Sequence, residues 1–336
     1  MAEEDLSEAS SVESIDSGER RSDALTWRDD LRHGSSGFLM GAADIVPGVS
    51  GGTMALIVGI YERLIAAISR IDREFTRHVL ARRFRDALHH ADLRFLMVLG
   101  GGIVAGAGGL ASVMKLLLNE HRSYTYAAFT GMILASSLIV SRRVPQWTLQ
   151  RIVLLILAAC GAWWLVTLSA LQNPPDSMFY LFFCGMIGIC AMILPGISGA
   201  FILLLLSRYE TVLNAIRSFV HLDLSANVLM TLVVFSTGCL TGLLTFSRVL
   251  RRLLANHHDS TIAVLCGFML GSLYRLWPFQ RDLTPEIADF KHKTLEHYVP
   301  NVLTSEVWSA AFIAVVAAAL VLTLDVVASR AARLRQ

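Results

Sequence analysis

Long apolar segments, separated by short polar ones, make up most of the chain after residue 36. Six of them are uninterrupted and come close to the ~17–25 residues that a helix needs to cross a bilayer. These six lie at 93–118, 124–140, 151–171, 225–250, 260–277 and 307–327. Two others, at 37–68 and 178–216, are broken in the middle by proline and glycine, which disrupt helices. The pattern predicts a membrane protein in which a broken segment precedes three spanning helices, twice.

The two broken segments are copies of one another. The first contains P-G-V-S-G at 47–51 and the second P-G-I-S-G at 195–199. A Tyr-Glu pair follows each motif at the same distance, at 61–62 and at 209–210. Apolar composition alone does not produce a motif and a pair at one fixed spacing, so the chain contains an internal repeat.

The repeat divides the chain into three parts. Residues 37–172 form a first membrane repeat and residues 173–336 a second. Residues 1–36 are rich in Glu, Asp, Ser and Arg and have almost no apolar periodicity, which predicts a disordered acidic cytoplasmic tail. A looser similarity between 115–123 and 252–260 extends the repeat into the spanning helices.

Composition supports a membrane protein and excludes several other classes. Hydrophobic residues make up 54% of the chain and charged residues 17%, against about 45–50% and about 25% in soluble proteins. The net charge of +2 and the absence of a basic stripe exclude a nucleic-acid partner. The five cysteines lie in apolar segments without a C-x-x-C pair, so neither a metal site nor a cofactor is predicted.

Positive charge predicts the topology, because Lys and Arg gather on the cytoplasmic side of membrane proteins. Arg-rich segments lie at 69–92, at 141–151, at 248–259 and in the C-terminal tail. All four fall on the cytoplasmic side if each broken segment is a re-entrant hairpin that returns to its own side. If the broken segments cross the membrane instead, 69–92 lies opposite 141–151.

The hairpin interpretation predicts the fold. It gives an all-α polytopic membrane protein with two inverted-topology repeats, each a re-entrant helical hairpin plus three transmembrane helices. Both termini are then cytoplasmic. The hairpins enter from opposite sides and their tips can meet near the midplane, as in secondary transporters with a binding site between inverted repeats.

Candidate binding residues gather at the hairpin tips. Each tip ends one half-helix and starts another, and the start of a helix presents free N–H groups that favour an anion, phosphate above all. The predicted hairpin-turn residues are Pro47, Gly48, Pro195 and Gly196. The predicted substrate ligands are Ser50, Gly51, Gly52, Thr53, Ser198 and Gly199. The alternative is that these residues only cap and turn the hairpins.

Several charged residues lie close to the tips in sequence. Asp44 sits inside an apolar segment, where an ionisable group costs at least ~2.5 kcal/mol and suggests function. It is a candidate proton carrier or a helix cap. Glu62 and Glu210 hold matched positions and are candidates for proton coupling or for interfacial hairpin ends. Arg63 and Arg208 could reach a phosphate from opposite sides, with Arg208 taken as a substrate ligand, or could extend to the lipid headgroups.

The paired motifs A-D-I-V-P-G-V-S-G-G-T and M-I-L-P-G-I-S-G, each followed by Tyr-Glu, resemble those of the polyprenyl-phosphate transporter family. The resemblance extends from about Gly37 to the last span. It implies a flippase of the bacterial cytoplasmic (inner) membrane that returns undecaprenyl phosphate from the outer to the inner leaflet for reuse in cell-envelope synthesis. The phosphate head would bind at the two tips, and the prenyl tail would stay in lipid between the repeats.

The implied partners are polyprenyl phosphate and membrane lipids, and the sequence leaves open whether the protein is a homo-oligomer. One departure separates the two tips. Ala200 and Phe201 stand in the second copy where Gly52 and Thr53 stand in the first, so the tips are not equivalent.

Two other functions compete with lipid transport. Undecaprenyl-pyrophosphate phosphatases also carry an embedded P-G-x-S motif in an inverted repeat, but there an Arg follows the Ser and a pair of glutamates lies upstream. Here Gly51 and Gly199 follow the serines, and Asp44 stands alone. Without that Arg, charge stabilisation of phosphoryl transfer is weak, which argues against an enzyme. The second alternative is a secondary transporter of a small soluble anion.

Overall fold

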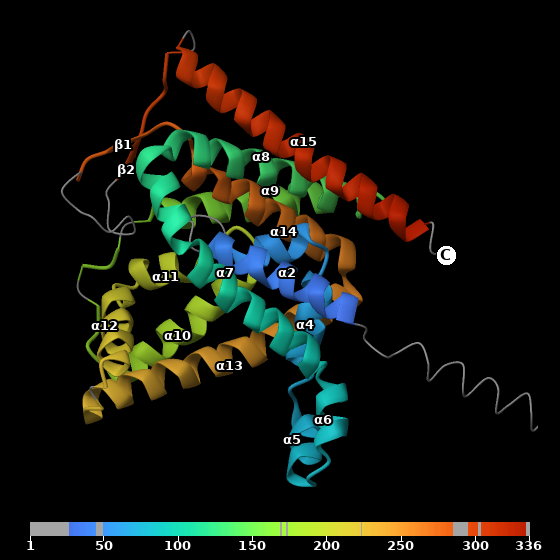
Figure 1. Ribbon diagram of the computed structural model, residues 1–336, viewed down its shortest axis with the longest axis vertical. Coiled ribbons are helices and arrows are strands. Elements are labelled where there is room, and N and C mark those ends of the chain that lie inside the picture. The colour runs from blue at the N-terminus through green and yellow to red at the C-terminus, as the bar shows by residue number, and fades with distance from the viewer. Residues whose placement is uncertain are drawn as a thin grey trace, which may run out of the picture.

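The computed structural model describes residues 27–44, 50–168, 170–172, 174–222, 224–284, 295–301 and 304–333. This part of the chain is almost wholly helical, as predicted (Figure 1). Its two strands, β1 (Gln280–Asp282) and β2 (Leu295–His297), form a small antiparallel pair in which Gln280 lies opposite His297.

The helices divide between the two halves of the chain. The first half contains α2 (Trp27–Asp44), α3 (Gly51–Ile57), α4 (Tyr61–Ser69), α5 (Arg73–Leu80), α6 (Phe84–His90), α7 (Leu93–Glu120), α8 (Arg122–Ser141) and α9 (Leu149–Thr167). The second half contains α10 (Met178–Ile193), α11 (Gly199–Leu205), α12 (Tyr209–Val220), α13 (Ala226–Asn256), α14 (His258–Ser272), the 3-10 turn Leu273–Leu276 and α15 (Ser305–Arg333).

Five of the six predicted spans are long and apolar enough to cross a membrane. They are α7, α8, α9, α13 and α15, and the number of candidate spans rises to seven if each broken segment is counted as one. The sixth prediction, 260–277, corresponds to α14, which has only 15 residues and continues into the 3-10 turn. The chain is therefore a multi-pass membrane protein.

The prediction of a disordered tail over 1–36 is wrong for its last part, because α2 begins at Trp27. Residues 1–26 lie outside the described residues. Helix α2 packs along α7 through small residues that carry no apolar signal. A Cβ added at Gly37 would lie 2.2 Å from the carbonyl oxygen of Leu99. Asp30 accepts two hydrogen bonds from the Arg94 guanidinium and thereby ties the polar start of α2 to α7.

The polar segment 69–92 also contains helices. Helices α5 and α6 form a short hairpin that projects from one end of the body (Figure 1). The side chain of Asp72 caps α5 by accepting hydrogen bonds from the N–H groups of Glu74 and Phe75, both at 3.0 Å.

Both broken segments bend sharply in the same way. Helix α4 turns from α3 by 120° and helix α12 turns from α11 by 114°. A residue with left-handed backbone lies at each bend, Gly59 (φ 74) in the first half and Ser207 (φ 53) in the second. These two residues hold matching positions in the repeat, so the two halves share the bend and the residue conformation that makes it.

Helix packing recurs at matching positions in the two halves. Helix α2 packs on α7 and helix α10 packs on α13 through glycines that leave no room for a side chain. A Cβ added at Gly102 of α7 would lie 2.2 Å from the Gly34 carbonyl oxygen, and one at Gly238 of α13 would lie 2.1 Å from the Phe182 carbonyl oxygen. Small residues of this kind let helices approach closely in membranes.

The last helix of each half packs on the other half. Helix α15 runs along α8, and helix α9 runs along α14 (Figure 1). Gly131 of α8 faces the Ala314 carbonyl, and Gly267 of α14 faces the Leu155 carbonyl. Helices α9 and α15 are thus exchanged between the halves. The main hydrophobic core also contains residues of both halves, chiefly from α3, α4, α7 and α8 of the first and from α13 and α14 of the second.

The junctions between the first two long helices of each half also match. His121 between α7 and α8 has φ −131° and ψ 42°, and His257 between α13 and α14 has φ −137° and ψ 48°. The hydroxyls of Thr125 and Thr261 bond the carbonyls of these histidines, each at 2.9 Å. In the structure His121 therefore corresponds to His257. The sequence similarity between 115–123 and 252–260 instead places His121 opposite His258, one residue further on.

Candidate functional site at the hairpin tips

The first tip lies between α2 and α3. Helix α2 ends at Asp44, and the turn that includes Pro47 and Gly48 lies outside the described residues. Ser50 precedes α3 in extended backbone, and its Oγ accepts a hydrogen bond from the Thr53 N–H at 3.2 Å. This is the capping role that a serine before a helix commonly takes. Ser50 and Thr53 are both fully buried.

The second tip lies between α10 and α11. Pro195 and Gly196 turn the chain after α10, and Gly196 has left-handed backbone with φ 85°. A Cβ added at Gly196 would lie 2.7 Å from both the Phe268 carbonyl oxygen and the Ser272 Oγ of α14, so only glycine fits. Ser198 precedes α11, and its side chain makes no capping hydrogen bond, unlike that of Ser50.

The structure brings the two tips into direct contact. The Gly196 N–H donates to Thr53 Oγ1 at 2.8 Å. Ser50 Oγ donates to the Leu194 carbonyl at 3.3 Å, and the Tyr61 hydroxyl donates to the Ile193 carbonyl at 3.2 Å. The first tip with α3 and α4 therefore holds the chain of the second tip from Ile193 to Gly196.

Glycines allow close backbone approach both between the tips, at Gly52, and within the second half, at Gly199. A Cβ added at Gly52 would lie 2.5 Å from the Ile193 carbonyl oxygen, and one at Gly199 would lie 2.7 Å from the Gly188 carbonyl oxygen. The backbone of one tip is thus packed against carbonyls rather than against side chains. Any larger residue at Gly52 would push the two halves apart.

Asp44 lies beside the start of α3 and caps it. Its Oδ1 accepts a hydrogen bond from the Gly51 N–H at 2.6 Å. The carboxylate therefore occupies the position at the helix start where the sequence predicted a phosphate. In this conformation the Gly51 and Gly196 amides and the hydroxyls of Ser50 and Thr53 all bond to protein groups.

The two matched glutamates lie away from the tip contacts. The Glu62 carboxylate pairs with His258 Nε2 at 3.4 Å, and His258 Nδ1 lies 3.3 Å from Asp259. Asp259 pairs in turn with Arg151 at 2.8 Å. This network joins α4, α14 and α9. Glu210 lies exposed in the first turn of α12.

Neither predicted arginine reaches the tips. Arg208 pairs with Asp176 at 3.0 Å and stacks on the Tyr180 ring, at the start of α10. Helix α10 has 16 residues, which span about 24 Å, and the tip lies at its other end. Arg63 pairs with Asp92 at 2.8 Å and lies over the Phe95 ring. Both guanidinium groups hold helix ends together.

A different arginine lies beside the second hairpin. Arg275, in the 3-10 turn after α14, lies over the Phe201 ring of α11 at 5.0 Å from its centroid. No carboxylate of the described residues forms an ion pair with it. Burial lowers the pKa of the nearby His297 imidazole, and the Arg275 charge lowers it further. Sequence reasoning missed Arg275, although a charge within a predicted span is itself a signal of function.

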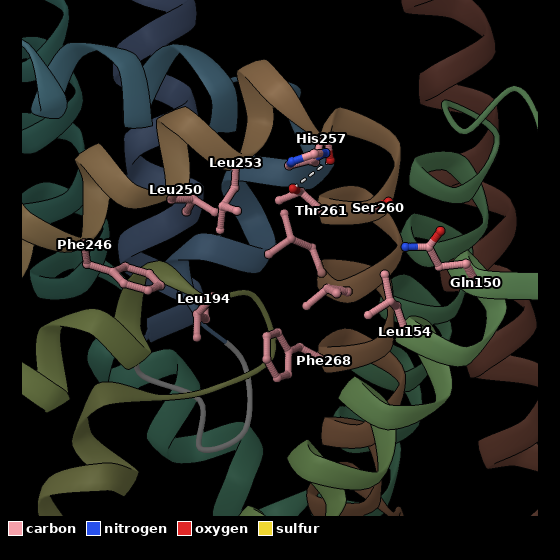
Figure 2. A pocket seen from close by; sticks show the side chains of 12 residues that line it. Gln150, Leu154, Leu194, Phe246, Leu250, Leu253, His257, Ser260, Thr261 and Phe268 are labelled. Carbon is pink, nitrogen blue, oxygen red and sulfur yellow. Dashed lines mark hydrogen bonds between the residues drawn. The ribbon is translucent and has the colours of Figure 1, made fainter.

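Two apolar pockets lie at matching places in the two halves. The second pocket, of about 490 Å³, lies between α9, α13 and α14 and reaches the second tip at Leu194 (Figure 2). It is lined by Gln150, Leu154, Leu194, Phe246, Leu250, Leu253, His257, Ser260, Thr261, Val264, Leu265 and Phe268. The first pocket, of about 530 Å³, lies between α7 and α8. It is lined by Met114, Leu117, His121, Tyr124, Thr125, Ala128, Phe129 and Met132.

Comparison with known proteins places the chain in a family. A polyprenyl-phosphate transporter of Vibrio cholerae is 39% identical over 298 residues, which cover 86% of this chain and 94% of that protein. A polyprenyl-phosphate transporter of Staphylococcus aureus is 32% identical over 256 residues, 72% of this chain and 84% of that protein. No solved structure gives a significant match. The VCA0040-like family model, described as undecaprenyl phosphate translocase-like, matches residues 40–293, and the chain belongs to this family.

Proposed function

We propose that this protein is a flippase that returns undecaprenyl phosphate across the bacterial cytoplasmic membrane, from the outer to the inner leaflet, for reuse in cell-envelope synthesis. Its relatives in Vibrio cholerae and Staphylococcus aureus are named polyprenyl-phosphate transporters, and its family is described as undecaprenyl phosphate translocase-like. The observation that carries the proposal is the contact of two matched hairpin tips between the two halves of a multi-pass membrane protein.

In this proposal the two halves are inverted repeats. Three spanning helices per half is an odd number, so the second half enters the membrane from the opposite side to the first. The Arg-rich segments support this arrangement because three of them meet on one side. Arg251 of α13 donates to Ser69 Oγ at 3.2 Å, and Arg151 of α9 pairs with Asp259 of α14 at 2.8 Å. That side is cytoplasmic by the distribution of positive charge, as are both termini.

The phosphate head binds where the tips now bond to each other. The amides of Gly51 and Gly196 and the hydroxyls of Ser50 and Thr53 are donors whose present acceptors phosphate oxygens can replace. Gly52, Ser198 and Gly199 complete the lining. Since these donors lie between the two halves, parting the tips on one side and then on the other exposes one binding site alternately to the two leaflets.

Two charged groups influence whether phosphate binds between the tips. The Asp44 carboxylate occupies the Gly51 N–H and repels a phosphate, so the phosphate is favoured when Asp44 takes a proton or moves away. If transport is coupled to protons, Asp44 is the group that binds and releases them. Arg275 lies at the end of α14 remote from the Arg-rich cytoplasmic side, and its charge attracts the phosphate from the outer leaflet.

A transport assay tests the proposal. Purified protein is placed in liposomes that contain undecaprenyl phosphate, and the leaflet distribution of the lipid is followed together with phosphate release from undecaprenyl pyrophosphate. We expect redistribution without phosphate release. Phosphate release would instead indicate a phosphatase, and neither result in folded protein would favour a transporter of small soluble anions.

Variants test the site through the binding of undecaprenyl phosphate to the purified, correctly folded protein. Ser50→Ala combined with Ser198→Ala should reduce binding of the phosphate lipid, because two hydroxyl donors are lost. Ser35→Ala, on an exposed face of α2, is the matched control. Unaltered binding in the double variant would mean that the serines only cap the hairpins.

A further inference from the structure

The two apolar pockets are copies of one site. His121 and His257 hold equivalent positions at the two helix junctions, 136 residues apart. All eight residues that line the first pocket, shifted by the same 136 positions, give residues that line the second. For example, Met114 corresponds to Leu250 and Ala128 to Val264. The two halves therefore share a cavity at corresponding positions as well as a corresponding pair of helices.

The chemistry of the pockets suits a hydrocarbon chain with a polar end. Their walls are Leu, Phe, Met, Val and Ala side chains. Polar groups lie only near the helix junctions, where each pocket has a histidine and a threonine in the same places. Both volumes fall within the ~300–1,000 Å³ range of small-molecule sites.

The second pocket adjoins the second hairpin tip at Leu194. The side chain of Leu194 lines the pocket, while its backbone carbonyl accepts the hydrogen bond from Ser50. Figure 2 shows Leu194 and Phe268 at the end of the pocket away from His257. The corresponding residue of the first tip, Val46, lies outside the described residues. A molecule with its head between the tips can thus extend an apolar chain into this pocket.

We propose that each pocket holds a segment of the prenyl chain of the transported lipid, the first pocket in the outer leaflet and the second in the inner leaflet. This rests on the proposed function and on the inverted arrangement of the halves. A carrier lipid that changes leaflet needs apolar room for its tail on both sides of one head site. Two copies of a single pocket, each beside a helix junction at opposite ends of the molecule, provide that room.

The prenyl chain can be located by photochemical labelling. The probe is a polyprenyl phosphate with a diazirine on the chain, in liposomes that contain the intact protein. We expect labelled peptides from 114–132 and from 246–268. Label confined to other segments would overturn the proposal. So would equal labelling by a diacyl phospholipid with the same diazirine that an excess of polyprenyl phosphate does not displace, since the pockets would then hold bulk lipid.

Filling each pocket separately gives a second test. Ala128→Trp and Val264→Trp should each abolish labelling of the filled pocket and slow transport. Leu116→Trp and Leu240→Trp, at exposed positions of α7 and α13, should do neither. If a pocket variant does not fold, the labelling pattern of the wild-type protein still tests whether the prenyl chain occupies the pockets. Normal transport in folded pocket variants would reject the tail sites and leave the proposed function standing, whereas absent transport in the wild type would reject the function itself.

Discussion

At the scale of single residues, the tips are held by groups that bond to one another. Thr53 Oγ1 accepts from Gly196 of the other half, and Asp44 accepts from Gly51 of its own half. The sequence predicted that these residues belong together, because a motif repeated at fixed spacing indicates a shared role. It could not predict that Asp44 would take the place of an anion, since that depends on the path of the turn.

Asp44→Asn should remove the part of the pH dependence of transport that Asp44 contributes. The amide oxygen of asparagine can still accept from the Gly51 N–H, but the side chain can neither bind nor release a proton. Wild-type transport should weaken as the pH rises, because a charged Asp44 competes with the phosphate. The measurement is the initial rate of lipid redistribution in liposomes over a series of pH values.

Glu62→Gln is the control for this experiment, because Glu62 pairs with His258 away from the tip contacts. Its pH profile should follow that of the wild type. If Asp44→Asn keeps the wild-type profile, Asp44 is a helix cap and carries no proton.

At the scale of helices, close packing through glycine organises both halves. The sequence alone does not show which glycines of α7 take part. Gly102 and Gly106 face backbone of α2, while Gly100, Gly101 and Gly108 have nothing nearby. The start of α2 was predicted to be a tail for a similar reason: it contacts α7 through Asp30, His33 and Gly34, which give no apolar periodicity.

Gly102→Ala should destabilise the protein, whereas Gly101→Ala should not. The added methyl group at Gly102 meets the Gly34 carbonyl at 2.2 Å, and overpacking of this kind costs about 1–3 kcal/mol. At Gly101 the methyl group meets no atom, and alanine favours a helix over glycine by up to ~1 kcal/mol. Thermal unfolding in detergent measures both variants, and equal midpoints would show that α2 and α7 are not packed through Gly102.

At the scale of the whole molecule, the sequence did not predict which helices pack against one another. The order of helices, the broken segments and the contact of the tips follow from the repeat. The packing of α9 and α15 on the opposite halves does not follow from the repeat, because the composition of an apolar helix does not indicate which helix it packs against. The position of Arg208 also depends on this packing: in the structure its guanidinium pairs with Asp176 at the start of α10 and does not contact the tips, so its role as a phosphate ligand stays a prediction.

The inverted arrangement predicts which surfaces face the cytoplasm. A cysteine at Leu80, at the end of α5, should react with a membrane-impermeant maleimide only from the cytoplasmic side. A cysteine at Val299, after β2, should react only from the outside. Both are tested in a background without the five native cysteines, by labelling whole cells and inverted vesicles. Reaction of both from the same side would mean that the second broken segment, 178–216, crosses the membrane.

The exchange of α9 and α15 also bears on how such a chain could have arisen. Two identical half-length chains, inserted in opposite orientations and each lending its last helix to the other, would make the same contacts between subunits. Fusing their genes adds a connection between α9 and α10 but requires no new helix–helix contact. Under the proposed inverted arrangement, the architecture matches that of a swapped dimer whose subunits are covalently joined, with tips that differ in having Thr53 in one and Phe201 in the other.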